Sequence, residues 1–194
     1  KKEGSKILSQ PIKGTAPRHA DPVIDHVVRE ELRNDPKEQA ENVMIVDLVR
    51  NDLARIAEPN SVNVDELFGI YTFNTVHQMI STISCTEKAN TSFTDVLRAT
   101  FPMGSMTGAP KRSAMELIEK HESFKRGLYS GSIGYITPNG DFDWNVVIRS
   151  LLYNRNKKHL SCAVGSAITI ASDPEKEYEE CLFKVERILS GMNQ

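Results

Sequence analysis

The chain has 194 residues, with 26 acidic and 24 basic side chains and a formal net charge of −2. This balance argues against a nucleic-acid-binding protein, which relies on clustered positive charge, and no run of about 18 apolar residues is available to cross a membrane. The 11 glycines and the 39% of hydrophobic residues bring the apolar share to roughly 45%, as in globular proteins that need no disulfide or metal to fold. Cys85, Cys162 and Cys181 are odd in number and widely spaced, which favours a reducing, cytoplasmic location.

The first part of the chain contains one well-marked helix. Asp35, Pro36 and Glu38 supply an N-cap, a first-turn proline and an acidic third residue, and the helix runs to about Leu53. The other expected elements are a strand end at Lys6–Gln10, a strand over 70–85, a helix at Thr94–Thr100, a glycine-rich loop at Pro102–Pro110 and a helix at Lys111–His121. Because a domain rarely begins within a sheet, we expect the chain to start inside a larger domain.

The second part of the chain reads as a meander followed by a helix. Antiparallel strands are expected at Tyr129–Thr137, Phe142–Tyr153 and Leu160–Ile170, with polar turns between them. Asp173 and Pro174 begin a last helix that reaches about Leu189. Strands and helices do not alternate, so the predicted class is α+β, with antiparallel sheets covered by helices.

Two acidic stripes lie on predicted helices. Glu38 and Glu41 are three residues apart, and Glu177, Glu180 and Lys184 share one face of the last helix. A divalent cation such as Mg²⁺ would relieve the repulsion within each pair of carboxylates. Two solvated helix faces would produce the same pattern, and spacing alone leaves both interpretations open.

Other residues are chemically suggestive and equally open at this level. Lys13 lies beside Gly14, where a partly desolvated amine could act as a nucleophile, although most lysines are surface charges. Arg149 ends an apolar strand and needs a partner such as a carboxylate. His77 lies in a predicted strand and could equally be a satisfied core histidine, whereas Gly165 indicates a bulge or a close backbone approach.

Four motifs in order give the chain a resemblance to a known family. They are Pro11–Thr15 (P-I-K-G-T), Glu41–Leu53 (E-N-V-M-I-V-D-L-V-R-N-D-L), Phe101–Lys111 (F-P-M-G-S-M-T-G-A-P-K) and Pro174–Glu180 (P-E-K-E-Y-E-E). Together they resemble the C-terminal part of the chorismate-utilising enzymes, which include anthranilate, aminodeoxychorismate, isochorismate and salicylate synthases. Residues 1–194 would then be the C-terminal portion of a single catalytic domain.

The resemblance implies a role for each matching residue. Glu41 and Glu180 are implied to bind Mg²⁺, with Glu38 and Glu177 nearby, and the metal would hold the ring carboxylate of chorismate. Further substrate contacts are implied for Tyr129, Arg149, the backbone at Gly165 and Lys184, which would meet a substrate carboxylate, and for His77 and Thr107, which would line the ring pocket.

Lys13 distinguishes the subfamilies. Anthranilate synthases resemble this stretch but carry a small apolar residue in place of Lys13, whereas a lysine is typical of aminodeoxychorismate synthases. The resemblance implies a transferase in which the Lys13 amine adds at ring C2 as the C4 hydroxyl leaves. Ammonia from a separate glutamine amidotransferase then enters at C4, giving 4-amino-4-deoxychorismate for p-aminobenzoate and folate synthesis. An anthranilate synthase, or a non-catalytic module that binds a ligand or the amidotransferase, are the alternatives.

The sequence departs from the family pattern in two places. Ala16 stands where the family often has arginine after P-I-K-G-T, and Ala167 replaces the second glycine of G-A-G-I. The N-terminal half of the family's domain is not in the sequence. We therefore expect that these 194 residues alone do not turn over chorismate.

Overall fold

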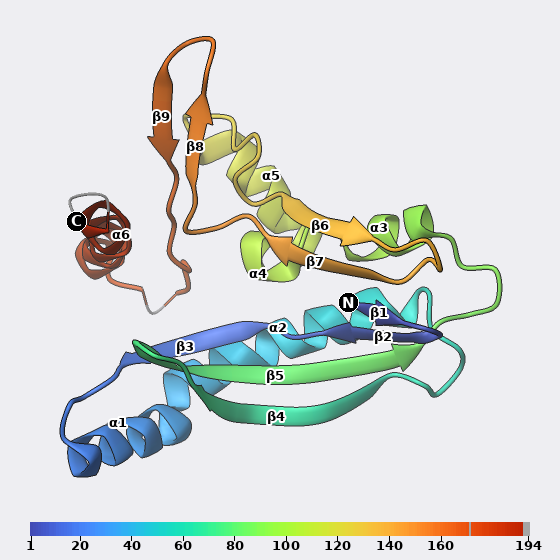
Figure 1. The fold of residues 1–194 in the computed structure, drawn as a ribbon, viewed down its shortest axis with the longest axis horizontal. Coiled ribbons are helices and arrows are strands. Elements are labelled where there is room, and N and C mark those ends of the chain that lie inside the picture. The colour runs from blue at the N-terminus through green and yellow to red at the C-terminus, as the bar shows by residue number, and fades with distance from the viewer. Residues whose placement is uncertain (171, 192–194) are drawn as a thin grey trace. The chain divides into compact units, whose positions relative to one another are not determined.

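The computed structural model describes residues 1–170 and 172–191, which form two compact units (Figure 1). The first unit comprises Lys1–Glu122 and Gly134–Trp144, and the second comprises Ser123–Ile133 and the chain from Asn145 onward. Within the described residues, no helix is both long enough and apolar enough to span a membrane.

An antiparallel sheet organises the first unit. Its strands are β1 (Lys2–Glu3), β2 (Lys6–Ser9), β3 (Ile12–Pro17), β4 (Asn63–Thr72) and β5 (Val76–Thr86), together with β6 (Ser132–Ile136) and β7 (Phe142–Val146), of which residues 134–136 and 142–144 belong to this unit. The strand order is β3-β5-β2-β1-β7-β6, and β4 also pairs with β5. Strand β5 is therefore central, because it bonds to β2 and β3 along one side and to β4 along the other.

The single strand expected over 70–85 is wrong, because the segment belongs to two strands. The chain reverses at residues 73–75, where the Phe73 N–H donates to the Val76 carbonyl at 2.8 Å. Asn74 in this reversal is a residue type that favours turns. The segment has neither the glycine nor the proline that would have marked the turn in the sequence.

The helices of the first unit are α1 (Pro22–Asn34), α2 (Pro36–Ala54), α3 (Phe93–Thr100), the short α4 (Gly104–Thr107) and α5 (Lys111–His121). The helices expected at 35–53, 94–100 and 111–121 are confirmed. Asp35 caps α2 by accepting the Lys37 and Glu38 N–H groups at 2.8 and 3.1 Å. Helix α1 was not expected, although Asp21 and Pro22 supply the same start signal.

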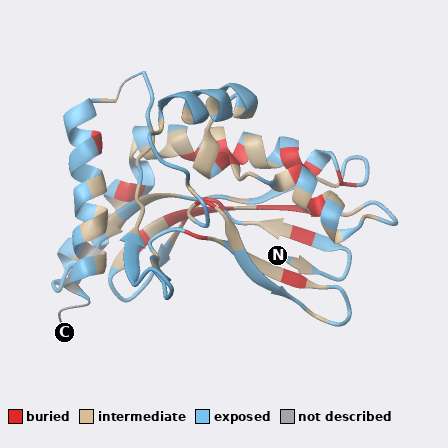
Figure 2. Ribbon diagram, turned by 90° about the horizontal axis from the view of Figure 1, so that it is seen from above, coloured by how far each residue is buried: buried red, intermediate tan, exposed pale blue. Residues whose placement is uncertain are grey.

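Helices α1 and α2 cover one face of the β3-β5 region (Figure 1). Alternate β5 residues point toward them: Met79 and Ile83 have no exposed surface, and Cys85 is buried. Val46 and Leu53 of α2 complete this core, which appears in red along β5 and α2 in Figure 2. The packing fixes α2 against the strands that carry Lys13 and His77.

The second unit contains a β-hairpin and a long helix. Strands β8 (Leu151–Asn154) and β9 (His159–Cys162) pair with each other, and α6 spans Pro174–Ser190. The last helix is confirmed. The three-strand meander is wrong: the expected 142–153 strand is divided between β7 and β8, and β9 is much shorter than 160–170. The chain breaks between β7 and β8 because Arg149 takes a left-handed φ of 50°.

Candidate functional site

Lys13 lies in a bulge within β3. Ile12 pairs with Ile80 and Thr15 pairs with Gln78, so two β3 residues oppose the single residue Met79. A bulge of this kind redirects a side chain out of the regular alternation. The Lys13 Nζ lies 3.2 Å from Glu41 Oε2 on α2, and the two side chains are 19% and 15% exposed.

Glu38 and Glu41 lie together on the same face of α2, as the spacing predicted. Burial raises the pKa of the Glu38 carboxyl, and the neighbouring charge of Glu41 raises it further. Lys13 bonds to Glu41. The half-buried Glu38 therefore lies beside a like charge, and carboxylate oxygens in this setting suit a hard cation such as Mg²⁺.

His77 is buried in β5, with 1% of its surface exposed. Its Nε2 lies 3.0 Å from Asp25 Oδ1 on α1, and its Nδ1 lies 3.0 Å from Thr72 Oγ1 on β4. Both ring nitrogens are thus paired within the first unit, as in a satisfied core histidine. Its role in the reaction stays a prediction.

Thr107 ends the short helix α4, where its hydroxyl donates to the Met103 carbonyl at 3.1 Å. Helix α4 packs on α2: a Cβ added at Gly104 would lie 2.9 Å from Leu48 Cδ1. Nearby, the Lys111 Nζ contacts the buried Asp52 carboxylate at 2.5 Å, which ties α5 to α2. No local sequence pattern indicated this buried ion pair.

Four predicted residues meet in the second unit. The Lys184 Nζ donates to the Gly165 carbonyl at 2.9 Å and pairs with Glu180 Oε1 at 2.6 Å. The Tyr129 hydroxyl lies 3.0 Å from the point that a Cβ on residue 165 would occupy. Glycine at 165 therefore lets the Tyr129 hydroxyl approach the backbone.

Tyr129 is held by the turn that precedes β6. The Ser130 N–H donates to the Val147 carbonyl and the Val147 N–H donates to the Gly131 carbonyl, both at 2.9 Å. The Arg126 guanidinium lies 6.0 Å from the centre of the Tyr129 ring. A cation over the ring face adds to the contacts that orient this side chain.

Arg149 does not join that group. Arg149 is exposed between β7 and β8, outside the apolar strand expected for it, and makes no hydrogen bond or ion pair within the part of the chain that the structure describes. Glu177 is buried on α6, at 8% exposure, whereas the neighbouring Tyr178 is 65% exposed.

The predicted metal ligands are divided between the two units. Glu38 and Glu41 belong to the first unit, and Glu177 and Glu180 belong to the second. Among residues 1–170 and 172–191 there is no cluster of three or more His, Cys, Asp or Glu side chains placed to bind a metal. Mg²⁺ stays a prediction that rests on the chemistry of the carboxylates.

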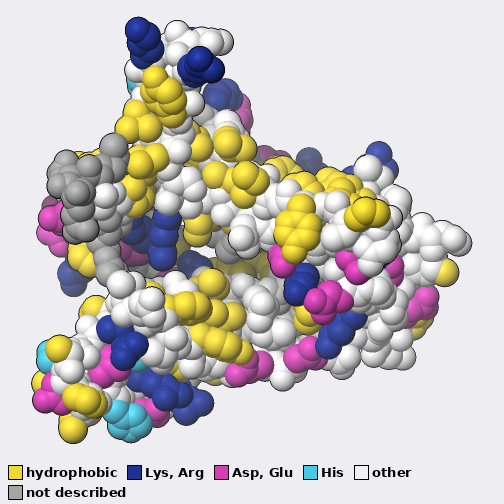
Figure 3. All heavy atoms as spheres, in the orientation of Figure 1, with side chains coloured by type: hydrophobic (Ala, Val, Ile, Leu, Met, Phe, Trp, Pro, Cys, Tyr) yellow, Lys and Arg dark blue, Asp and Glu magenta, His cyan; other side chains and the backbone are white. Residues whose placement is uncertain are grey.

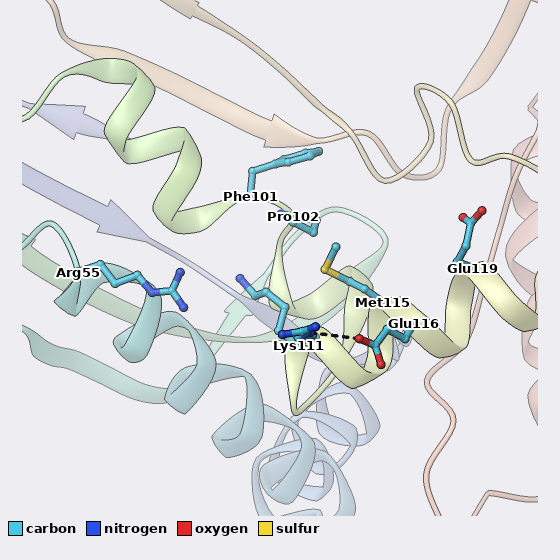
Figure 4. Close-up of a pocket in the computed structure, with 8 residues that line it drawn as sticks. Arg55, Phe101, Pro102, Lys111, Met115, Glu116 and Glu119 are labelled. Atoms are coloured by element: carbon cyan, nitrogen blue, oxygen red, sulfur yellow. Dashed lines mark hydrogen bonds and ion pairs between the residues drawn. The ribbon is translucent and has the colours of Figure 1, made fainter.

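A shallow pocket elsewhere on the first unit contains none of the predicted site residues (Figure 4). Phe101 and Met115 form its apolar part, and Arg112 and Glu116 pair at its rim with a distance of 3.1 Å. The pocket is therefore distinct from the two groups of predicted residues.

Sequence reasoning missed the partners of His77. Asp25 is 52 residues away, and its place opposite His77 follows from α1 packing on β5. The start signal at Asp21 and Pro22 could have indicated the helix that carries it. No sequence signal indicated the residue that Asp25 would meet.

Comparisons with known proteins agree with this fold. The family model for chorismate binding enzymes matches residues 1–190. Aminodeoxychorismate synthase component 1 from Klebsiella aerogenes is 47% identical over 183 residues, which is 94% of this chain and 40% of that protein. Anthranilate synthase component 1 from Streptomyces coelicolor is 38% identical over 194 residues, which is 100% of this chain and 38% of that protein.

A solved structure supports the same assignment. The 2,3-dihydroxybenzoate-specific isochorismate synthase from Bacillus anthracis has a TM-score of 0.85 and 28% sequence identity, covering 99% of this chain and 50% of that one. The predicted α+β class with antiparallel sheets is confirmed. The chain spans about two-fifths of the length of the two curated relatives described above.

Proposed function

Because this chain belongs to the chorismate-binding enzymes, we propose that it is the part of an aminodeoxychorismate synthase that carries the reactive lysine. The observation that carries the proposal is the Lys13 amine, which lies in a strand bulge 3.2 Å from the Glu41 carboxylate. The Klebsiella relative, at 47% identity, bears the name of this enzyme. The activity belongs to the whole protein, of which this chain would supply one portion.

Lys13 performs the covalent step in this proposal. The neutral amine forms a bond to ring C2 of chorismate while the C4–O bond breaks, and a proton from the amine goes to the departing hydroxyl, which leaves as water. Ammonia then forms the C4–N bond, the C2–N bond to Lys13 breaks, and the lysine is regenerated. Atoms balance as chorismate plus ammonia giving 4-amino-4-deoxychorismate plus water.

Glu41 serves Lys13 as well as the metal. Its carboxylate lies within hydrogen-bond distance of the Lys13 Nζ, and the bulge keeps the amine aimed at α2. Glu41, with Glu38 beside it and with Glu180 and Glu177 of the second unit, would hold Mg²⁺. When bound, the ion supplies positive charge for the ring carboxylate of chorismate.

The second unit would bind the other substrate carboxylate. Tyr129 and Lys184 each lie against residue 165. Arg149, whose guanidinium makes no ion pair among the described residues, is suited to a bidentate contact with a carboxylate. His77 and Thr107 would line the ring pocket. A glutamine amidotransferase would supply the ammonia, and the free cysteines are in keeping with a cytoplasmic enzyme.

The test uses the complete protein with chorismate, ammonia and Mg²⁺, and identifies the product by mass. We expect K13A to lose aminodeoxychorismate formation by on the order of 10³-fold or more, because the covalent route is removed. K37A is the matched control, since Lys37 is an exposed lysine on α2 next to Glu38. Wild-type rates for K13A would refute the covalent role of Lys13.

The same assay separates the alternatives. Anthranilate as the product of the unmodified protein would identify an anthranilate synthase, the activity named for the Streptomyces coelicolor relative. Failure to consume chorismate with Mg²⁺ and ammonia present would instead indicate a binding module. Lys13 argues against an anthranilate synthase, because anthranilate synthases resemble this stretch with a small apolar residue at that position.

A further inference from the structure

His77 is held at both ring nitrogens by residues from different elements. Asp25 of α1 contacts Nε2 and Thr72 of β4 contacts Nδ1, each at 3.0 Å. The ring is 1% exposed and borders a small pocket of about 210 Å³ that Asp25 and Thr72 also line. Charged side chains and histidines gather over α1 on this side of the first unit (Figure 3).

Asp25 is itself fixed in place by other groups. The Arg18 Nε lies 2.9 Å from each carboxylate oxygen, and the His19 N–H donates to Oδ1 at 2.8 Å. These contacts hold the pKa of the Asp25 carboxyl well below its usual range, chiefly through Arg18. Asp25 is therefore a carboxylate at neutral pH, and a carboxylate only accepts hydrogen bonds.

The geometry therefore determines which nitrogen of His77 carries the proton. Since Asp25 can only accept, the bond to it requires a proton on Nε2. In the neutral ring, Nδ1 then has the lone pair and accepts from the Thr72 hydroxyl. Nδ1 is the ring nitrogen that remains able to take up a proton.

We infer that Asp25, held by Arg18, is a positioning residue that fixes His77 in its Nε2–H form and keeps Nδ1 as the proton-accepting nitrogen. The inference rests on the proposed function in one respect, namely that His77 serves the reaction. Backbone pairing supports it: His77 lies opposite Ala16 on β3, close along the strand to the bulge that carries Lys13. Asp25 thus links α1 to β5, the strand that carries His77 and pairs with the Lys13 strand β3.

A spectroscopic test reads the tautomer directly in the complete protein. With ¹⁵N-labelled histidine, and with H77Q to assign the signal, we expect the unmodified protein to show protonated Nε2 and unprotonated Nδ1. D25A should lose this preference, because Thr72 can accept from Nδ1–H as readily as it donates. T72V should keep it, and D47A, which breaks the exposed Asp47–Arg50 ion pair, is the matched surface control.

Kinetics then test whether the position matters. We expect D25A to lower kcat by roughly 10- to 100-fold with KM changed less than about 3-fold, a part of what an acid–base group contributes. The double variant D25A/H77Q should have a kcat only slightly lower than that of H77Q alone. If D25A does not fold, R18M takes its place as the test variant, because it keeps Asp25 but removes one of its partners. We expect R18M to lower kcat by less than about 10-fold.

Two results would overturn the inference: an Nδ1–H tautomer in the unmodified protein, or an unchanged tautomer in D25A. A wild-type kcat for D25A alongside an inactive H77Q would also overturn it. Full activity of H77Q would instead contradict the part of the proposed function that gives His77 a role in the reaction. The tautomer measurement would still decide whether Asp25 positions the His77 ring.

Discussion

At the residue scale, Glu38 and Glu41 place two carboxylates on one turn of α2, and the repulsion between them affects the pKa of Glu38. Lys13 bonds to Glu41, and burial together with the Glu41 charge raises the pKa of Glu38. A folded state with a raised carboxyl pKa binds more protons than the unfolded chain between the two pKa values. The stability of the metal-free protein should therefore fall as pH rises through that interval.

E38Q tests this sign. The amide removes the ionised form, so at pH 7 with a chelator present we expect the Tm of E38Q to exceed that of the unmodified protein by about 2 °C. The gain should disappear near pH 3, where Glu38 is protonated in both states. Thermal denaturation at the two pH values measures it, and E58Q at an exposed position should show neither effect. A lower Tm for E38Q at pH 7 would contradict the interpretation.

At the element scale, the β3 bulge depends on Gly14. Its φ of +89° is a left-handed conformation that side chains rarely adopt. A Cβ there would lie 3.1 Å from Leu32 Cδ1, 3.2 Å from Glu38 Oε2 and 3.3 Å from Met79 Cβ. Because Gly14 has no side chain, α1, α2 and β5 can pack closely around it, next to Lys13.

G14A is therefore expected to lower the free energy of unfolding by about 2–3 kcal/mol, from backbone strain and from crowding. G140A is the matched control, because Gly140 has a similar φ of +86° but no atom within 4 Å of an added Cβ. We expect G140A to cost only the backbone part, about 1 kcal/mol. Equal losses in chemical denaturation would show that the packing around Gly14 contributes nothing.

The elements also show what local sequence can predict. Helix α2 follows from Asp35 and Pro36, because caps act within one turn of the chain. The turn at 73–75 has no glycine or proline, so β4 and β5 read as one strand. The Lys13 bulge depends on pairing with a strand more than 60 residues away. Local patterns contain no information about such register shifts.

The candidate site was predicted mainly by motif resemblance rather than by local chemistry. Spacing alone did not separate Glu38 and Glu41 from an ordinary solvated helix face, and only the fold brings Lys13 to Glu41. Neither the motif resemblance nor the local sequence predicted the Asp25–His77 contact, because it joins an unexpected helix to a strand residue 52 positions away. Long-range contacts between elements set the chemistry, and they depend on packing.

At the scale of the whole molecule, stability should be distributed unevenly across the first unit. Strand β5 bonds to three strands, and Met79, Ser81 and Ile83 have no exposed surface. Helix α1 buries little more than Leu32, while Val23, Ile24 and Val27 are 44–73% exposed. Opening α1 therefore breaks far fewer contacts than opening the sheet.

Hydrogen exchange followed by mass spectrometry on the complete protein measures this difference. We expect peptides from β5 to exchange at least about 100-fold more slowly than peptides from α1, since local opening of α1 leaves the β5 core intact. Helix α2, which packs on the same sheet and buries Val46 and Leu53, serves as the internal comparison for a well-anchored helix. Equal protection of α1 and β5 would contradict the argument and would mean that the helix carrying Asp25 unfolds only together with the sheet that carries His77.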